Sequence, residues 1–262
     1  MKVPDWLADY SECLYLLARF NPPQSTGWQG GREWERAAAR ALQTPVRQGP
    51  GSLKLFGRGS ASGLAHEVDG AGAGRGWTLI HEAKAYSQRS PSKEELFTFD
   101  RKTFDLYVER RRFGEEGEHW RSLILAGPLD DGVRRYCYLY GIVAVDAELI
   151  PLPMLLRMAG RPNADLYFSD QVLGELVRLG EEACAPMEAR YIPESRDRIY
   201  LNIRKLMTNS QLDDLLWLQR DVTADLLELV DREQPGYFED RATDITSRFG
   251  LSLVARSKQT AA

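Results

Sequence analysis

Residues 64–86 constrain the fold most strongly, because they place two alternating segments on either side of a glycine-rich connection. Side chains alternate between the two faces of a β-strand, so the segments 64–69 and 77–86 are each predicted to form a short strand. Four of the seven residues from Gly70 to Gly76 are glycine, which is typical of a flexible turn. The stretch therefore predicts an antiparallel hairpin with a glycine-rich tip.

Charged side chains on these predicted strands could together form a cation-binding site. Glu67 and Asp69 share one strand face, and so do Glu82 and Lys84. Two carboxylates about 4 Å apart repel by roughly 4 kcal/mol at an effective dielectric near 20, so either one is protonated or a cation sits between them. Mg²⁺ suits such a site, because it keeps several waters and takes substrate phosphate as a further ligand. With a lysine alongside to orient water or neutralise a phosphoryl oxygen, the pattern predicts metal-assisted phosphodiester hydrolysis.

Other features of this region are predicted to have structural roles. His66 and His81 lie on the strand face opposite the carboxylates, where packing is a commoner role for histidine than ligand or base. Gly57–Gly63 and Gly70–Gly76 are followed by neither a helix nor the GKS or GKT ending of a phosphate-binding loop. Both glycine-rich segments are therefore expected to be turns.

The spacing of the charged residues resembles a known superfamily. Asp69, a gap of twelve residues and then Glu82-Ala83-Lys84 is similar to the signature of the PD-(D/E)xK nucleases, which include restriction-type enzymes and Holliday-junction resolvases. Val68 stands where the superfamily's name has proline. The resemblance covers residues 28–126, less than half of the chain.

The same resemblance extends upstream to the segment from Gly31 to Leu42. This segment resembles the helix that opens the Mrr-like and resolvase branches and carries an additional acidic ligand. Glu35 directly follows the aromatic Trp34 and matches that acid better than Glu33 does. The resemblance therefore adds Glu35 to the candidate site.

The resemblance implies a fold, a cofactor and a set of roles. The implied fold is an α/β restriction-endonuclease-like core, a mixed central sheet flanked by helices in the order αβββαβ, with a mostly helical C-terminal extension. Asp69, Glu82 and the Ala83 carbonyl would hold Mg²⁺, with Mn²⁺ as an alternative, and Glu35 would bind a second metal or an outer-shell water. Lys84 would position the attacking water, and Glu67 is a reserve ligand.

Hydrophobic periodicity predicts the remaining elements. Helices are expected at 4–20, 32–43 and 92–112, with a polar loop at 24–31. Strands are expected at 53–56, 121–126 and 136–145, and further helices at 153–159, 169–183 and 210–233. Ser92 and Glu95 form a capping box at the start of one helix. The predicted segments are an N-terminal helix and loop (1–27), a nuclease-like core (28–150) and a mostly helical extension (151–262).

The distribution of charged residues does not decide whether the protein binds nucleic acid. The net charge of −4 gives no global basic excess for binding a phosphate backbone. Residues 84–112 contain eight Lys or Arg residues against five acidic residues, which fits either phosphate contacts or a solvated helix end. Aromatic and cationic residues are interleaved between positions 191 and 205, which fits nucleic-acid binding or packing between domains.

The cellular environment is predicted from what the sequence lacks. Cys13, Cys137 and Cys184 are scattered and odd in number, which predicts neither a zinc site nor a disulfide framework. Asp5 and Asp9 precede any apolar run, and no apolar stretch is long enough to span a bilayer. A cytoplasmic protein without a membrane partner is expected.

The leading functional hypothesis is a Mg²⁺-dependent endonuclease acting on DNA, with RNA left open as a substrate and with a restriction or phage-defence role. Its C-terminal helices would serve a homodimer or a partner protein. A second hypothesis is a nuclease-fold module without turnover that binds nucleic acid or a protein. A third is a structural hairpin whose acids and lysine form only a solvated ladder of ion pairs, since surface pairs contribute little to stability.

Overall fold

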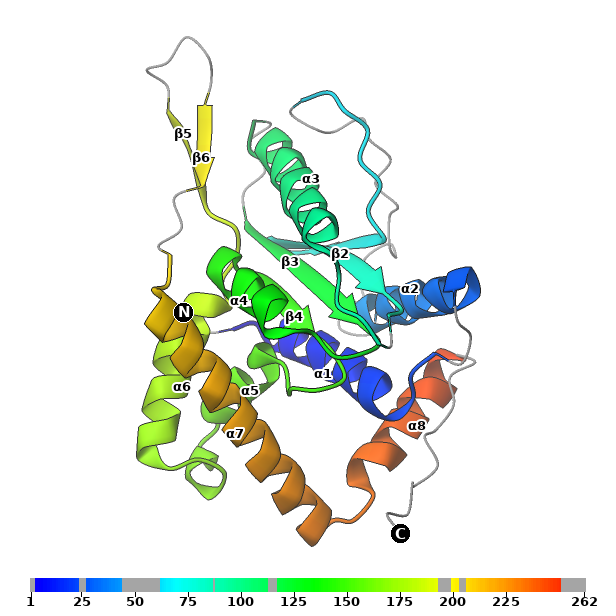
Figure 1. Cartoon of the computed structure of the whole chain (residues 1–262), viewed down its shortest axis with the longest axis vertical. Helices are drawn as coiled ribbons and strands as arrows, with labels where there is room; N and C mark the ends of the chain where they lie inside the picture. Colours follow the sequence, from blue (N-terminus) through cyan, green and yellow to red (C-terminus); the bar gives the residue numbers. More distant parts are fainter. Residues whose placement is uncertain are drawn as a thin grey trace.

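The chain folds around a four-stranded mixed sheet, as Figure 1 shows. The computed structural model describes residues 3–23, 27–43, 62–86, 88–112, 117–192, 199–202 and 206–250. The strands of the sheet are β1 (Gly70–Gly74), β2 (Trp77–Lys84), β3 (Glu118–Leu125) and β4 (Ile142–Val145), in that spatial order. The β1–β2 pair is antiparallel, whereas β2–β3 and β3–β4 are parallel. The predicted α/β class is confirmed at this level.

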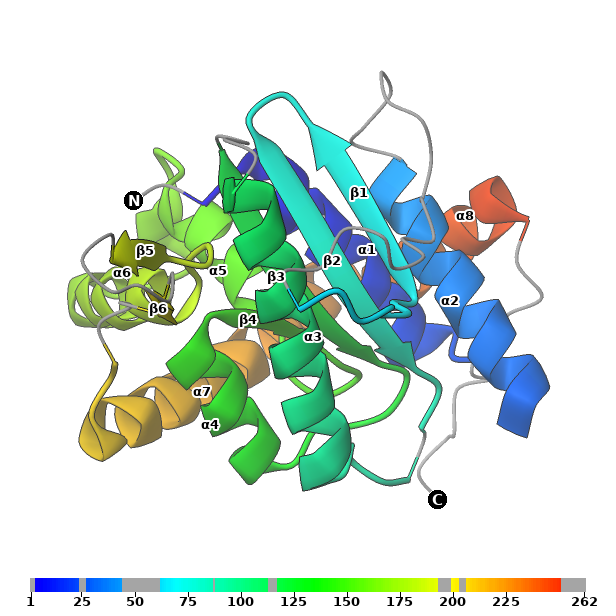
Figure 2. The ribbon, with the colours of Figure 1, turned by 90° about the horizontal axis from the view of Figure 1, so that it is seen from above.

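Helices cover both faces of the sheet (Figure 2). The helices on one face are α1 (Asp5–Phe20), α2 (Gly27–Gln43) and α5 (Leu152–Ala159), and those on the other are α3 (Lys93–Arg112) and α4 (Asp131–Tyr140). Strand alternation separates the two cores: Leu79 and Ala83 pack with α1 and α2, whereas Ile80 packs with α3 and α4. The side chains of β2 that are an even number of residues from Ile80 therefore share its face of the sheet and point toward α3.

The C-terminal half is mostly helical, as predicted. It contains the short helix η1 (Ala164–Leu166), then α6 (Asp170–Ala183), α7 (Asn209–Glu233) and α8 (Tyr237–Phe249), and a separate hairpin of β5 (Ala189–Ile192) and β6 (Ile199–Asn202). The β5–β6 hairpin and α8 were not predicted. One hydrophobic core joins the three predicted segments and includes Leu14, Ile124 and Leu215. The boundaries at 27 and 150 remain predictions.

The predicted strand at 64–69 is wrong, and the predicted glycine turn is a strand. Residues 63–68 have no regular structure, and β1 begins at Gly70. A Cβ on Gly72 would lie 2.4 Å from the Leu42 side chain, so this strand needs glycine to let α2 pack closely. The turn itself is at residues 75 and 76, where Gly76 has a φ of 79°.

The predicted strand at 136–145 is also wrong over its first half, which belongs to α4. The Asp130 side chain caps this helix by accepting a hydrogen bond from Val133 N at 3.1 Å. Gly141 ends the helix in the left-handed region with a φ of 65°, and β4 follows. Tertiary packing and two caps thus outweigh the strand preference of the tyrosines in this segment.

The other described elements agree with the predictions apart from their ends. The Ser92–Glu95 capping box is confirmed by the bonds Ser92 N to Glu95 Oε2 at 2.7 Å and Glu95 N to Ser92 Oγ at 3.2 Å. Helix α2 starts at Gly27, inside the predicted loop. The predicted strand at 53–56 lies outside the described residues. No helix in the described part of the chain is both long and apolar enough to cross a membrane.

Candidate functional site

The fold brings Asp69, Glu82 and Lys84 together; we call these three residues the carboxylate–lysine cluster. Lys84 Nζ lies 2.7 Å from Glu82 Oε1 and 3.7 Å from Asp69 Oδ2. Asp69 lies at the bend before β1, and its Oδ2 accepts a hydrogen bond from Ala83 N at 2.8 Å. One ammonium group therefore contacts two carboxylates from separate segments of the chain.

The period of β2 explains why Glu82 and Lys84 share a face. Both lie on the same strand face as Ile80 and point toward α3, whereas His81 and Ala83 point toward α1. The predicted shared strand face of Glu67 and Asp69 is wrong, because neither residue lies in a strand. The Glu67 side chain is exposed, so its role as a reserve ligand remains a prediction.

Lys102 on α3 is a member of this site that the sequence analysis did not identify. Its Nζ forms an ion pair with Glu82 Oε2 and lies 2.9 Å from the carbonyl oxygen of Glu67. Lys102 falls between Phe99 and Leu106 on the buried stripe of α3, where its side chain is only 11% exposed. A lysine at helical spacing between two buried apolar residues is unusual without a counter-ion, and this pattern is the signal that could have identified it.

A buried ion pair fixes α3 against the sheet close to Lys102. The Arg121 side chain on β3 is 3% exposed and pairs with Asp100 on α3, two residues before Lys102. Arg121 also donates a hydrogen bond to the Tyr140 carbonyl oxygen, and the Tyr136 hydroxyl donates one to Asp100 Oδ2 at 3.1 Å. Breaking such a pair leaves an uncompensated buried charge, so these contacts hold the helix that presents Lys102.

Burial and charge set the protonation of the cluster. Burial, with repulsion from Glu82 second, raises the pKa of Asp69, and the Lys84 ammonium and the Ala83 N–H oppose this rise. Burial acts to lower the pKa of Lys84, but the attraction of Glu82 and Asp69 outweighs it, so the pKa of Lys84 is raised. Lys84 is therefore a cation at neutral pH, and its ammonium group partly offsets the effect of burial on Asp69.

Comparison with known proteins tests whether the resemblance in sequence extends to a recognisable family. No family model, curated protein or solved structure matches the chain. The resemblance to the PD-(D/E)xK superfamily therefore depends on the residues of the cluster and on their order in the chain.

The donor set of the cluster suits Mg²⁺ in part. Among the described residues, no group of three or more His, Cys, Asp and Glu side chains is placed to hold a metal ion. Mg²⁺ is commonly held by one or two carboxylates, with waters and substrate phosphates as the other ligands. Asp69 and Glu82 supply two carboxylates, and a divalent cation would act in the same direction as Lys84 and Lys102, which already oppose the raised pKa of Asp69. Both oxygens of Glu82 already accept from lysines, so a metal would compete with these contacts.

Glu35 and Ala83 have less support than the cluster. Glu35 is half-buried on α2, which packs on the sheet face opposite Lys102. Glu35 is not among the partners that the described residues give to Asp69, Glu82 or Lys84. Ala83 contributes its N–H to the cluster, whereas the role of its carbonyl as a metal ligand remains a prediction, as does the role of Glu35.

The two histidines lie outside the cluster. His81 is fully buried, and its ring centroid lies 6.2 Å from that of Tyr10 on α1. Burial lowers the pKa of His81 to about 4, so its ring is neutral at neutral pH. His66 Nε2 lies 2.6 Å from Asp105 Oδ2, which ties the segment before β1 to α3. In the described structure neither histidine ring has a hydrogen bond or ion pair with the cluster.

Proposed function

We propose that the protein is a Mg²⁺-dependent endonuclease that hydrolyses phosphodiester bonds in DNA. The observation that supports this proposal is the convergence of Asp69, Glu82 and Lys84 at one patch, with Lys84 Nζ within 4 Å of both carboxylates. Side-chain exposures of 18% for Asp69 and 23% for Lys84 leave the patch accessible from solvent. The finer fold assignment, a restriction-endonuclease-like core in the order αβββαβ, is part of the same proposal.

Each residue of the cluster has a role in this proposal. Asp69 and Glu82 would hold the Mg²⁺, which when bound supplies a Lewis acid for the phosphoryl group and a more acidic water. Lys84 remains protonated because two carboxylates face it, so it donates to the attacking water or to a phosphoryl oxygen rather than acting as a base. Lys102 holds the second oxygen of Glu82 and thereby orients this carboxylate.

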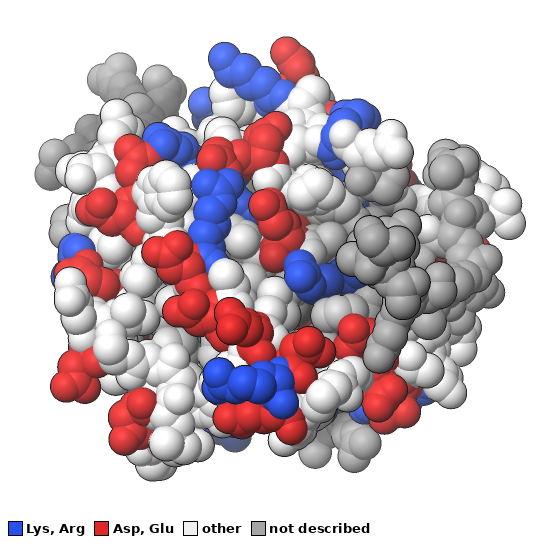
Figure 3. Space-filling view, turned by 60° about the horizontal axis from the view of Figure 1, so that its bottom comes forward, with Lys and Arg blue, Asp and Glu red and all other residues white. Residues whose placement is uncertain are grey.

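DNA would approach from the α3 side of the sheet, where Glu82 and Lys84 point. Lys93 and Arg101 on α3 are exposed and are available for phosphate contacts. Figure 3 draws the side of the molecule that is at the bottom of Figure 1, where α7 and α8 lie, and not the α3 side; there, small groups of Lys and Arg are mixed with Asp and Glu. The proposal includes a cytoplasmic restriction or defence role, which agrees with three free, buried cysteines.

Cleavage of supercoiled plasmid DNA in Mg²⁺ tests the proposal. The wild-type protein should nick or linearise the plasmid, and chelation of Mg²⁺ should stop the reaction. Asp69→Asn and Lys84→Met should each abolish cleavage. Glu94→Gln removes one negative charge, as Asp69→Asn does, but at an exposed position on α3, and it should retain cleavage. Cleavage that persists in both cluster variants would refute the assignment.

A second candidate function is a nuclease-like module that binds nucleic acid or a protein without turnover. The observation in its favour is that Lys84 and Lys102 occupy both oxygens of Glu82, as they would if amines had replaced a metal. This candidate predicts that DNA is retained in a gel-shift assay with and without Mg²⁺ but is never cut. Binding that depends on Mg²⁺ and leads to cleavage would exclude it.

A further inference from the structure

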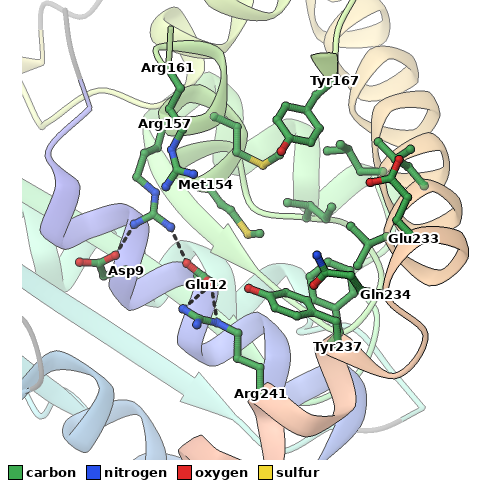
Figure 4. Close-up of a pocket in the computed structure, with 16 residues that line it drawn as sticks. Asp9, Glu12, Met154, Arg157, Arg161, Tyr167, Glu233, Gln234, Tyr237 and Arg241 are labelled. Atoms are coloured by element: carbon green, nitrogen blue, oxygen red, sulfur yellow. Dashed lines mark hydrogen bonds and ion pairs between the residues drawn. The ribbon is translucent and has the colours of Figure 1, made fainter. Parts of the chain in front are cut away.

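A second candidate site lies among α1, α5, α7 and α8, apart from the carboxylate–lysine cluster. The cavity there has a volume of about 600 Å³, within the range of small-molecule sites in proteins. Figure 4 shows that its side chains come from helices far apart in the sequence. Its floor is apolar and includes Ile150, Met154 and Leu226, which are 1–7% exposed. The cavity therefore combines a preformed apolar base with a polar rim.

One wall of the cavity carries an excess of positive charge. Glu12 on α1 is 9% exposed and pairs with Arg157, and its Oε1 accepts from Arg241 Nε at 2.9 Å and Nη2 at 2.8 Å. Arg157 also pairs with Asp9, so two acids here face three arginines once Arg161 is included. Figure 4 shows the Arg161 side chain extending into the cavity beside Arg157.

Asp9 and Glu12 pair with Arg157 and Arg241, and Arg161 forms no ion pair with either acid. Its side chain is exposed and forms no hydrogen bond or ion pair with the part of the chain that the structure describes. The guanidinium group presents several N–H donors in a plane, which suits the oxygens of a phosphate or carboxylate. This wall therefore favours an anionic group on a ligand.

Aromatic rings and hydrogen-bond acceptors line the rest of the cavity. Tyr167 and Tyr237 are 38% and 41% exposed, which is high for such large rings, and both line the cavity. Figure 4 shows Glu233 and Gln234 at the end of α7 on the side away from Arg161. Neither of these two side chains has a hydrogen-bond partner among the described residues. Both side chains are exposed, and a planar ring bearing N–H donors could hydrogen-bond to them and stack on a tyrosine.

We propose that this cavity binds a purine nucleotide with its phosphate at Arg161, its base against the tyrosines and an N–H edge at Glu233. Guanine is the base that fits, because its ring N–H and amino group can donate together to one carboxylate. A fatty acid fits less well, because its chain would make no hydrogen bond with Glu233 or Gln234 and has no ring to stack on a tyrosine. The proposal does not depend on nuclease activity.

Isothermal titration calorimetry of the full chain with GMP tests the proposal. GMP should bind saturably, and guanosine, inorganic phosphate and AMP should each bind at least about tenfold more weakly, since each lacks one charge-assisted contact. Arg161→Gln and Glu233→Gln should each weaken GMP binding by about tenfold or more. Arg178→Gln, an exposed arginine on α6 paired with Glu175, should leave GMP binding unchanged.

Three results would overturn the proposal. The first is the absence of saturable GMP binding at millimolar concentration, and the second is equal affinity for GMP and AMP. The third is an equal effect of Arg161→Gln and Arg178→Gln on GMP binding. Because Arg161 is exposed and without a described partner, its substitution should leave the fold intact, which circular dichroism checks.

Discussion

Lys102 on α3 and Glu82 on β2 form an ion pair whose side chains are 11% and 12% exposed. The pair joins a helix to the strand that carries the carboxylate–lysine cluster. It also gives Glu82 two ammonium partners, since Lys84 occupies the other carboxylate oxygen. The charge of the cluster therefore depends on a residue outside the signature from Asp69 to Lys84, although within the residues 28–126 that the resemblance covers.

Replacing Lys102 by methionine should strengthen divalent metal binding. Loss of one positive charge beside Glu82 frees a carboxylate oxygen and removes repulsion of the incoming cation, and we expect Mn²⁺ to bind about tenfold more tightly. Calorimetric titration with Mn²⁺ measures this change. Lys102→Arg keeps the charge and should bind Mn²⁺ as the wild type does. Equal affinity of the methionine variant and the wild type would mean that Lys102 does not compete with a metal.

Substituting Gly70 by alanine should destabilise the fold. A Cβ at this position would lie 2.3 Å from His81 Nε2, and the buried His81 ring has little room to move. We expect the free energy of unfolding to fall by about 1–3 kcal/mol, as for other overpacked cores. Urea denaturation measures it.

A second glycine gives a matched control for this substitution. Gly174 lies exposed inside α6, and a Cβ there meets nothing within 4 Å. Gly174→Ala should raise the free energy of unfolding by about 0.5–1 kcal/mol, because alanine restricts the unfolded chain and favours a helix. A Gly70→Ala protein as stable as the wild type would contradict the close approach of His81 to β1.

His81 should make stability depend on pH below neutrality. Burial lowers its pKa from 6.5 in the unfolded chain to about 4 in the folded chain, so the unfolded state binds the extra proton between these values. The stabilisation is complete above pH 6.5 and is lost as the pH falls through this window, by about 3 kcal/mol in total. Urea denaturation at several pH values measures the loss.

The variant His81→Leu lacks this titration and should show a flatter profile between pH 6.5 and 4. Other acidic groups contribute equally to both proteins, so the difference between the two profiles isolates His81. Parallel profiles for the two proteins would show that His81 does not have the low pKa that its burial implies.

The N-cap of α4 should contribute measurably to stability. Asp130→Ala removes the acceptor of the Val133 N–H, and we expect a loss of about 1 kcal/mol from the free energy of unfolding. Asp225→Ala, at an exposed position on α7, should change stability by less than about 0.5 kcal/mol. An equal effect of the two substitutions would argue against a helix that begins after Asp130.

The sequence predicted those elements that depend on residues close together in the chain. The apolar period gives α1, and the capping box of Ser92 and Glu95 gives the start of α3. The period of two along β2 correctly places Glu82 and Lys84 on one face. These features need no knowledge of distant residues.

Features that depend on distant residues were not predicted. β1 consists of glycine and alanine, and its strand conformation depends on the close approach of Leu42 and His81 rather than on its own preference. Lys102 enters the site only because α3 folds over β2, which its sequence spacing does not reveal. The meeting of Asp69 with Lys84 was expected from a hairpin, but Asp69 reaches the site from the bend before β1.

The central claim is that Asp69 and Glu82 together hold a divalent cation beside Lys84. Calorimetric titration of Mn²⁺ into the wild type, Asp69→Asn and Glu94→Gln tests it most directly. We predict saturable binding to the wild type and to Glu94→Gln, and binding at least about tenfold weaker to Asp69→Asn. Identical titrations of the wild type and Asp69→Asn, or no Mn²⁺ binding by the wild type, would contradict the claim.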